Sequence, residues 1–345
     1  MAEKKNNDVL IATIIIILVI VAIVVFLTLR DRRAASEAGG AGTAIGEALA
    51  PEKGGDPRSG EDRHDGSDRA RRAAATGQPW LELPASTTEG PGEREGLYCT
   101  THYGTLNGTK ARNYTILYDP ETYASYWVAY PICAAHLGTG RKESWGYDPA
   151  IPKEKQTSVS SGYGVSYATQ KYSSNSYARG HQIPNADRNG CEEMMAQTYY
   201  STNMTPQLQN GFNGHIWAKL EKAVRDMVPV GDTLYVVTGA SFRKVGGNEE
   251  IHYITNKNGG TSLPVPNYYW KVVLKVKRDA NGISDASAIG FWLPHEEITE
   301  RQWYDYTVSV DQIEAWTGFD FFANLSTSLQ DGSEANTDLE SFRSY

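Results

Sequence analysis

One short segment of the chain places an imidazole among guanidinium groups. In the run Tyr177-Ala178-Arg179-Gly180-His181-Gln182-Ile183-Pro184-Asn185-Ala186-Asp187-Arg188, His181 lies between Arg179 and Arg188. A neutral imidazole can take a proton from water, and guanidinium groups bind phosphate oxygens through paired N–H donors. A lone histidine is more often structural, but this segment has no apolar periodicity that would bury it. It therefore predicts a general base beside phosphate, active at neutral or alkaline pH.

A second segment combines an amide, a carboxylate and a guanidinium at helical spacing. After the run Asn203-Met204-Thr205-Pro206-Gln207, the residues Asn213, Trp217, Glu221 and Arg225 follow at intervals of four. Residues four apart lie along one slowly drifting face of a helix. The side-chain oxygen of Asn213 is a hard ligand of the kind that suits Mg²⁺, which needs few protein ligands. We therefore expect this helix to carry a metal ligand.

Each of these residues also has a structural interpretation. Asn213 could cap the helix by accepting hydrogen bonds from the free amides of its first turn. Glu221 and Arg225 could form an i,i+4 ion pair, which is worth only about 0.3 kcal/mol. The grouping on one face favours chemistry instead, with Glu221 orienting water at the metal and Arg225 approaching a phosphate.

A glycine-containing loop offers another phosphate ligand. Gly138-Thr139-Gly140 precedes the basic pair Arg141 and Lys142, and Tyr147-Asp148-Pro149 follows. Glycines in such a loop expose the basic side chains, although the loop could equally be a simple hairpin end. An aromatic-rich stretch from Tyr163 to Tyr177 is a candidate substrate-side loop.

The elements that must position these groups are mostly strands. Short aromatic or β-branched runs alternate with turn residues, which is typical of strands and hairpins. Apolar residues at helical spacing, followed by a proline, predict helices between and after them. The pattern indicates a mixed α+β class with a central, mainly antiparallel sheet and flanking helices. The expected strands are 113–118, 126–130, 233–238, 268–276 and 286–293, and the expected helices are 213–228 and 310–317.

The N-terminal part of the chain has a different composition. After a short tail, residues 1–8, residues 9–29 form an almost unbroken apolar run of the length that a helix needs to cross a bilayer. A secretory signal has a similar start but a shorter apolar core, so an uncleaved membrane anchor is favoured. Residues 30–90 are rich in small and charged residues and predict a flexible linker. The folded domain is expected at residues 91–345.

The charge of the domain counts against a high-affinity nucleic-acid binder. From Gly96 onward, 21 Lys and Arg stand against 26 Asp and Glu, a net of −5. A protein that binds nucleic acid tightly along its length neutralises many phosphates and needs a basic field. An enzyme that holds one or two phosphates locally and then releases its polymer does not need such a basic field.

The three cysteines, Cys99, Cys133 and Cys191, lack the spacing of a metal site. An odd number allows at most one disulfide within the chain, for which Cys99 with Cys133 is the favoured pair. Buried free thiols are an equally good interpretation.

Together these residues resemble the DNA/RNA non-specific endonucleases of the ββα-metal, or His-Me finger, class. The resemblance extends from about Leu97 to Leu325 and rests on several separated motifs in the order that the family has. They are Trp127-Val128-Ala129-Tyr130, Arg179-Gly180-His181-Gln182-Ile183-Pro184, Asn203-Met204-Thr205-Pro206-Gln207, Asn213 with Trp217-Ala218-Lys219-Leu220-Glu221, Val237-Thr238-Gly239, Tyr269-Trp270-Lys271-Val272 and Val310-Asp311-Gln312-Ile313-Glu314.

This resemblance implies a metal-dependent enzyme that hydrolyses phosphodiester bonds of DNA and RNA and leaves 5′ phosphates. It implies that His181 is the general base and that Asn213 binds Mg²⁺ directly, with Mn²⁺ able to replace it. Glu221 would hold water on the metal, and Arg179 and Arg225 would lie near the scissile phosphate.

The family's further catalytic arginine precedes an aromatic residue and Asp-Pro, so Arg141 is the expected carrier, with Lys142 as the alternative. The family often has Asp before Arg-Gly-His, whereas this chain has Ala178. If that Asp tunes the site, activity is lower here. The rival hypothesis is a membrane-tethered nucleic-acid-binding or DNA-uptake component with little or no cleavage.

The location of the domain is inferred from function. The basic residues on the two sides of the apolar run are balanced, so the positive-inside rule gives no orientation. A sugar-non-specific nuclease in the cytoplasm would attack the nucleic acid of its own cell. We therefore expect the domain outside the cytoplasm, either anchored or secreted after cleavage. The sequence indicates neither a protein inhibitor nor an oligomeric state.

Overall fold

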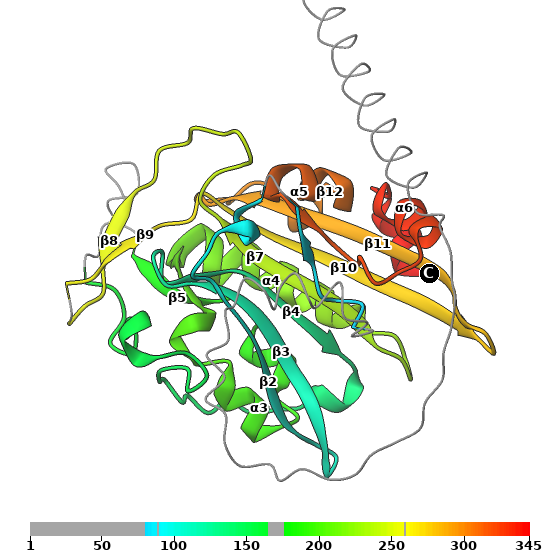
Figure 1. Ribbon diagram of the computed structural model, residues 1–345, viewed down its shortest axis with the longest axis horizontal. Coiled ribbons are helices and arrows are strands. Elements are labelled where there is room, and N and C mark those ends of the chain that lie inside the picture. The colour runs from blue at the N-terminus through cyan, green and yellow to red at the C-terminus, as the bar shows by residue number, and fades with distance from the viewer. Residues whose placement is uncertain (1–79, 88–89, 165–175, 259) are drawn as a thin grey trace, which may run out of the picture. The chain divides into compact units, whose positions relative to one another are not determined.

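The computed structural model of the chain describes residues 80–87, 90–164, 176–258 and 260–345 (Figure 1), which fall within one compact unit, Asp62–Tyr345. The predicted tail, the predicted anchor and the linker up to residue 79 lie outside the described residues. In the part of the chain that is described, no helix is both long enough and apolar enough to span a membrane.

The fold begins before residue 91, which corrects the predicted end of the linker. Leu81 and Leu83 are buried, and strand β1 (Ala85–Ser86) pairs antiparallel with β13 (Phe319–Asp320). Residues 30–90 are mostly small and charged, so their average composition did not reveal the short apolar segment at the end. Leu81 and Leu83 in this segment are enough to pack against the domain.

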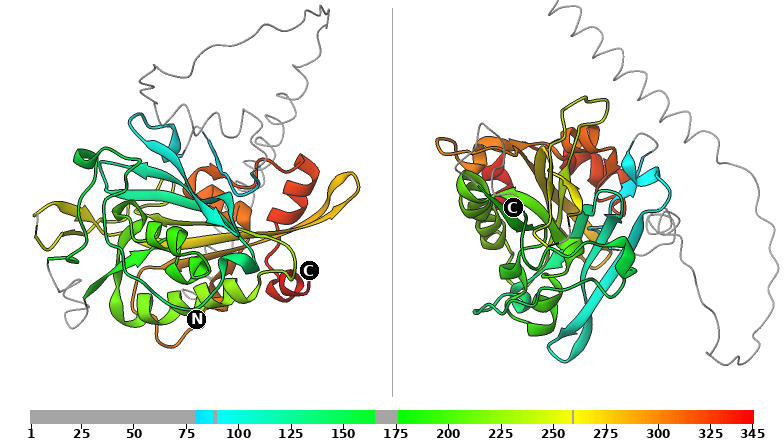
Figure 2. Two further views of the ribbon diagram at one scale, coloured as in Figure 1. Left: turned by 90° about the horizontal axis from the view of Figure 1, so that it is seen from below. Right: turned by 90° about the vertical axis from the view of Figure 1, so that its left-hand side faces the viewer.

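A seven-stranded sheet forms the centre of the domain, in the order β12-β11-β10-β7-β4-β3-β2 (Figures 1 and 2). Every neighbouring pair is antiparallel, and the five predicted strands are all present. The predicted α+β class with a central antiparallel sheet is therefore confirmed. The strands are β2 (Tyr98–Leu106), β3 (Thr109–Asp119), β4 (Ala124–Ile132), β7 (Leu234–Ser241), β10 (Tyr268–Asp279), β11 (Gly282–Pro294) and β12 (Thr307–Val308).

Shorter elements surround this sheet. Two further strand pairs are β5 (Tyr177–His181) with β6 (Met204–Leu208), and β8 (Tyr253–Thr255) with β9 (Ser262–Pro264). The described helices are η1 (Pro91–Glu93), η2 (Ala134–His136), η3 (Lys153–Lys155), η5 (Asn185–Arg188), α3 (Glu192–Gln197), η6 (Ser201–Asn203), η7 (Gln209–Trp217), α4 (Ala218–Asp226), η8 (Trp303–Tyr306), α5 (Val310–Thr317), α6 (Thr327–Glu334) and α7 (Leu339–Ser344).

The sheet separates two apolar cores. Side chains alternate along a strand, so Tyr269 of β10 faces one core and Trp270 faces the other. The first core includes Leu220 of α4, and the second includes Ile313 of α5. The η7–α4 layer and the α5 layer therefore cover opposite faces of the sheet (Figures 1 and 2).

A long connection on one face carries almost the whole candidate site. Strands β4 and β7 are neighbours in the sheet, yet about 100 residues, 133–233, separate them in the sequence. This connection holds β5, β6, η7 and α4. It contributes buried residues to the first core and none to the second. The central strands thus act as a platform for the residues singled out in the sequence.

All three cysteines are free thiols, so the predicted Cys99–Cys133 disulfide is wrong. The strand register explains why. Cys99 lies level with Leu117 and, across β3, with Trp127, whereas Cys133 follows the far end of β4. A disulfide requires Cα atoms within about 7 Å, which this separation along β4 does not allow.

Candidate active site

Two short strands and a helix form the centre of the site. In the β5–β6 pair, Arg179 lies opposite Pro206 and His181 opposite Met204. Segment η7 follows β6 directly and continues into α4, so the order is strand, strand, helix. The strands predicted from the sequence include neither β5 nor β6. Gly180 and Pro206 had concealed the two strands, because neither residue is typical of strand interiors.

Gly180 allows a contact that orients Asn213. A Cβ atom at Gly180 would overlap the side chain of Gln207, which is fully buried. Gln207 Oε1 accepts a hydrogen bond of 2.6 Å from Nδ2 of Asn213. This fixes the amide so that Oδ1, which makes no hydrogen bond within the described residues, remains as its free ligand atom. Asn213 lies inside the helix, after the non-helical Asn210 and Gly211, so it is not the N-cap residue that the structural interpretation required.

A kink places Asn213 at the beginning of the helix. Asn210 and Gly211 have non-helical backbone angles, and Gly211 has a φ of +74°. A Cβ atom at Gly211 would also lie 2.9 Å from the backbone of Glu297. The regular turns therefore begin at Phe212. Asn213 lies in the first of them, where free N–H groups and the helix dipole favour anions.

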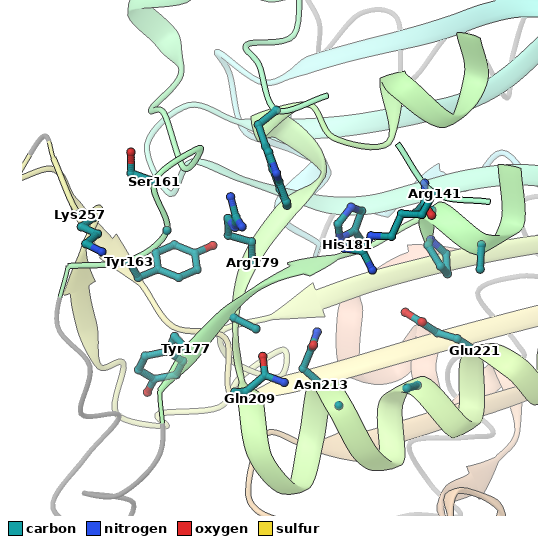
Figure 3. A pocket seen from close by; sticks show the side chains of 18 residues that line it. Arg141, Ser161, Tyr163, Tyr177, Arg179, His181, Gln209, Asn213, Glu221 and Lys257 are labelled. Atoms are coloured by element: carbon teal, nitrogen blue, oxygen red, sulfur yellow. The ribbon is translucent and has the colours of Figure 1, made fainter. Parts of the chain in front are cut away.

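An open pocket of about 600 Å³ brings the predicted residues together (Figure 3). Five of the six predicted site residues line it, and only Arg225 does not. In Figure 3, His181 and Arg141 lie on one side, while Asn213 and Glu221 project from the helix on the other. The five lining residues are Arg141, Arg179, His181, Asn213 and Glu221.

His181 is uncharged near neutral pH. Burial, followed by the positive charge of Arg141, lowers its pKa to about 3. The ring makes a hydrogen bond with the backbone of Arg179, while its buried Nε2 has no hydrogen-bond partner among the described residues. The arrangement leaves one ring nitrogen anchored and the other without a partner.

Arg179 is held by an aromatic face. Its guanidinium lies 3.6 Å from the ring centroid of Trp145, and Nη1 donates to the carbonyl oxygen of Ser160. The indole N–H of Trp145 donates to Glu143 at 2.8 Å, and its ring centroid is 5.7 Å from that of His181. Trp145 therefore links the positions of the guanidinium and the imidazole.

The structure separates the two candidates for the further cation. Arg141 lines the pocket, with its Nη2 3.3 Å from the carboxylate of Glu143. Lys142 forms an ion pair with Glu192 and does not line the pocket. Of the two residues, Arg141 is the one that can reach a phosphate in this pocket.

Arg225 and Arg188 were expected near phosphate, but neither lines the pocket. Arg225 was expected to approach a phosphate, but it forms an ion pair of 2.9 Å with Asp187 instead. This pairing also differs from the alternative i,i+4 pair with Glu221. An ideal helix drifts by about 40° every four residues, which turns Arg225 away from Asn213.

Arg188 is fully buried and donates hydrogen bonds to Asn113 and to backbone carbonyl oxygens. It is structural, so only Arg179 of the two flanking guanidiniums faces the pocket.

A buried lysine beneath the helix was missed. Lys271 of β10 is fully buried, donates to Thr238 and lies 4.6 Å from the ring centroid of Trp217. Burial raises the pKa of Glu221 to about 7, and Lys271 and Arg225 oppose that rise. Burial lowers the pKa of Lys271 to about 8, which Glu221 opposes. The sequence does contain a signal for Lys271. It is a lysine that lies between Tyr269 and Val273 on the inward face of an otherwise apolar strand.

The outer rim adds another cation that sequence reasoning missed. Lys257, just beyond β8, is exposed and lines the pocket with Tyr163 and Tyr177. These tyrosines are the ends of the aromatic-rich stretch predicted to be a substrate-side loop, of which residues 165–175 lie outside the described residues. Lys257 follows a short strand and carries no sequence signal of its own.

The chain is similar to known nucleases in sequence and in fold. The DNA/RNA non-specific endonuclease family matches residues 98–328. A nuclease of Nostoc sp. is 29% identical over 236 residues, which cover 65% of this chain and 76% of that protein. A nuclease of Serratia marcescens is 28% identical over 227 residues, which cover 63% and 75%. The crystal structure of the EndoG/EndoGI complex shares the fold, with a TM-score of 0.51 and 20% identity over 67% of this chain and 89% of that one. The chain belongs to the DNA/RNA non-specific endonuclease family.

Proposed function

We propose that this chain is a metal-dependent, sugar-non-specific endonuclease that hydrolyses phosphodiester bonds of DNA and RNA and leaves 5′ phosphates. The observation that carries the proposal is a neutral imidazole with an unpartnered nitrogen, in the same pocket as an oriented amide oxygen and two guanidiniums. That set supplies a base, a hard ligand and phosphate-binding cations.

The residues present suit Mg²⁺, with Mn²⁺ as a substitute. Asn213 offers Oδ1 because its amide nitrogen is engaged by Gln207, and the Glu221 carboxylate lies on the same helix and in the same pocket. Mg²⁺ usually keeps several waters and takes one or two protein ligands. When bound there, the ion stabilises negative charge on the phosphate and on the leaving oxygen.

His181 acts as the general base. Its neutral ring takes a proton from a water molecule that attacks phosphorus in line with the 3′ oxygen. The P–O3′ bond breaks, the 3′ oxygen leaves and takes a proton from water, and the phosphate stays on the 5′ side. A base with a pKa of about 3 is weak, but Arg141 and Arg179 contribute to that low value. The anionic substrate neutralises these charges when it binds, which raises the pKa of His181 where proton transfer occurs.

The cations and Glu221 position the reactants. Arg179, held on Trp145, and Arg141 bind the phosphate oxygens, and Glu221 orients water near Asn213. Behind them, Arg225 and Lys271 balance the charge of Glu221 and Asp187. Arg225 thus acts through these carboxylates and not on the phosphate itself.

The lining of the pocket supports binding that does not depend on base sequence. Phosphate contacts position a nucleic acid without reading its sequence, and aromatic side chains stack on any base. The polar groups grouped around His181 suit phosphate, and Trp145, Tyr163 and Tyr177 supply aromatic surface. We further propose that the domain works outside the cytoplasm, either on a membrane anchor formed by residues 9–29 or secreted after cleavage.

One observation supports the rival function, a tethered binding module with little cleavage. Ala178 lines the pocket beside Arg179, at the position where the family often has Asp. A site with a weakened base would still hold phosphate. The alternative predicts nucleic-acid binding without cleavage, whether or not Mg²⁺ is present.

The test uses the purified full-length chain in a non-ionic detergent. Supercoiled plasmid and ribosomal RNA are incubated with it in MgCl₂ or in EDTA. Both polymers should be cut in MgCl₂ only, and the DNA fragments should ligate to adaptors without kinase treatment, as 5′ phosphates require. Intact polymers that comigrate with the protein would support the binding module, and cleavage of one polymer would show a narrower nuclease.

A further inference from the structure

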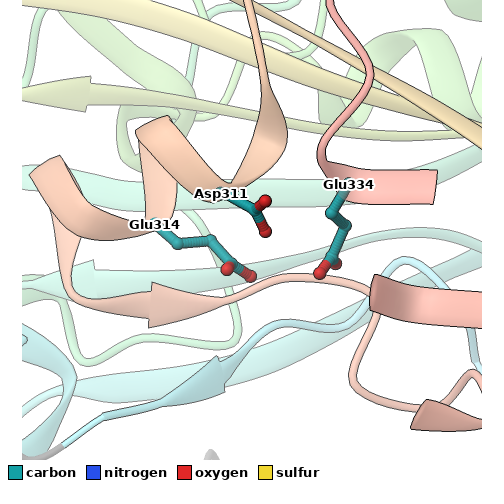
Figure 4. A group of neighbouring side chains, drawn as sticks. All are labelled: Asp311, Glu314 and Glu334. Carbon is teal, nitrogen blue, oxygen red and sulfur yellow. The ribbon is translucent and has the colours of Figure 1, made fainter. Parts of the chain in front are cut away.

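Three carboxylates meet on the face of the sheet opposite the pocket. Asp311 and Glu314 are one turn apart on α5, and Glu334 is the last residue of α6. One oxygen from each lies within 4.8 Å of the others, and Figure 4 shows the three side chains converging. The α5 helix packs with the second core, whereas the His181 pocket is built on the first.

Glu334 is the unusual member of this cluster. The residue is only 3% exposed, and its buried Oε1 has no hydrogen-bond partner. The charged groups that act on it most strongly are the carboxylates of Glu314, Asp320 and Asp311, which together with burial raise its pKa to about 10. It also lies at the C-terminal end of α6, where the helix dipole disfavours a negative charge. Buried carboxylates normally have a cation or hydrogen bonds to compensate them.

The surrounding contacts hold the cluster in place. The backbone N–H of Phe321 donates to Glu314 at 2.6 Å, which ties α5 to the segment after β13. The Gln330 side chain of α6 donates to Asp320 and to the carbonyl oxygen of Phe321. The convergence therefore joins three segments: α5, α6 and the chain around β13.

We infer that Asp311, Glu314 and Glu334 bind a calcium ion. Ca²⁺ takes six to eight oxygen ligands at about 2.3–2.6 Å, so two of its ligands can lie up to about 5 Å apart. The three carboxylate oxygens lie within 4.8 Å of one another, which is inside that span. Mg²⁺ holds its ligands at about 2.1 Å, keeps several waters and usually takes one or two carboxylates. Three converging carboxylates therefore favour Ca²⁺ over Mg²⁺.

The ion has a structural role. It compensates the charge that collects at the end of α6 and crosslinks α6 to α5 over the second core. This role is separate from phosphodiester cleavage, because the ligands lie across the sheet from His181 and Asn213. The site predicts a folding stability that depends on Ca²⁺ even when the catalytic pocket cannot hold a metal.

Calorimetry of the EDTA-treated, full-length chain tests the inference. Calcium chloride at about 100 times its dissociation constant should raise the melting temperature by about 5 °C or more, as expected for a ligand that binds only the folded state of a domain of this size. The increase should persist in Asn213→Ala, which removes the proposed catalytic metal ligand. It should also persist in Asp331→Asn, which removes an exposed carboxylate from the same helix.

The cluster variants provide the decisive comparison. Glu334→Gln preserves shape and replaces a carboxyl group that stays protonated without a cation, so its melting temperature in EDTA should be no lower than that of the wild type, while the calcium-dependent increase is lost. Asp311→Asn should lose the increase as well. A wild type that does not respond to calcium would overturn the inference. So would a Glu334→Gln variant that responds fully, or an Asn213→Ala variant that does not respond.

Discussion

Two carboxylates with raised pKa values, Glu221 and Glu334, lie on opposite faces of the sheet and have different surroundings. Burial raises the pKa of Glu221 to about 7 and, with like charges, that of Glu334 to about 10. Lys271 and Arg225 lower the pKa of Glu221 against burial and the nearby Asp187, whereas the charged groups that act most strongly on Glu334 are all carboxylates. The first face carries its own counter-charges, and the second requires a proton or an ion from solution.

This difference distinguishes the functions of the two faces. Fixed cations keep Glu221 able to ionise close to neutral pH, which a residue that orients water in a catalytic pocket needs. A carboxylate without such cations is ionised only when a cation binds. We therefore expect substitutions on the first face to change the rate of cleavage and those on the second to change stability.

The largest effect is expected at His181. Removing a general base typically lowers the rate by about 10²–10⁴-fold, so His181→Ala should lower kcat by that factor on plasmid and on RNA. The exposed His252 provides the matched control, because His252→Ala leaves the pocket intact. Initial rates of both variants, with circular dichroism to confirm folding, measure the difference. Equal rates for the two variants would remove His181 from the mechanism.

A smaller effect separates two adjacent cations. Arg141 lines the pocket, while Lys142 pairs with Glu192 outside it. Arg141→Ala should therefore lower kcat/KM by about 10²-fold, as the loss of a charge-stabilising donor does, and Lys142→Ala should change it by less than about twofold. Steady-state kinetics on a defined oligonucleotide gives both values. The reverse order would assign the phosphate contact to Lys142.

The next effect is on the pH dependence. Cleavage that needs ionised Glu221 should decline as the pH falls through about 7, because burial raises the pKa of Glu221 to that value. Lys271 lowers this pKa, so Lys271→Met should move the decline to higher pH and cut the rate at pH 7 by about tenfold, with recovery at pH 9. Glu221→Gln should abolish the decline. A Lys271→Met variant with reduced activity but an unshifted pH profile would indicate only a structural role for the lysine.

The smallest effect on cleavage is expected at Glu334. Its carboxylate lies with Asp311 and Glu314 on the opposite face, so Glu334→Gln should leave kcat and KM within about twofold of the wild type at a temperature where both are folded. Plasmid cleavage at 25 °C measures this. A tenfold loss of kcat in the folded variant would show that the two faces are coupled.

The sequence predicted the central strands better than the charge interactions in the site. Strands such as β10 and β11 have long aromatic and β-branched runs, and their prediction needs no tertiary information. The β5–β6 pair was missed because Gly180 and Pro206 weaken the strand signal. Its pairing depends on contacts such as Gly180 with Gln207, which are visible only in three dimensions.

The site shows the same limit. Residue type and spacing identified Arg141, Arg179, His181, Asn213 and Glu221, all of which line the pocket. Spacing alone could not tell that Arg188 is buried in backbone contacts or that Arg225 turns towards Asp187. Nor could it identify Lys271, because the electrostatic effect of a strand lysine on a helix glutamate depends on which residues the fold brings together.

The most direct test of the central claim is chemical rescue of His181→Ala with imidazole. If His181 takes a proton from water, added imidazole should restore part of the lost rate, and the restored rate should rise with pH as the fraction of neutral imidazole does. Asn213→Ala should not respond to imidazole, because it lacks a ligand and not a base. A His181→Ala variant that is folded, binds Mg²⁺ and DNA, and is not rescued at any pH would contradict the assignment of His181 as the general base.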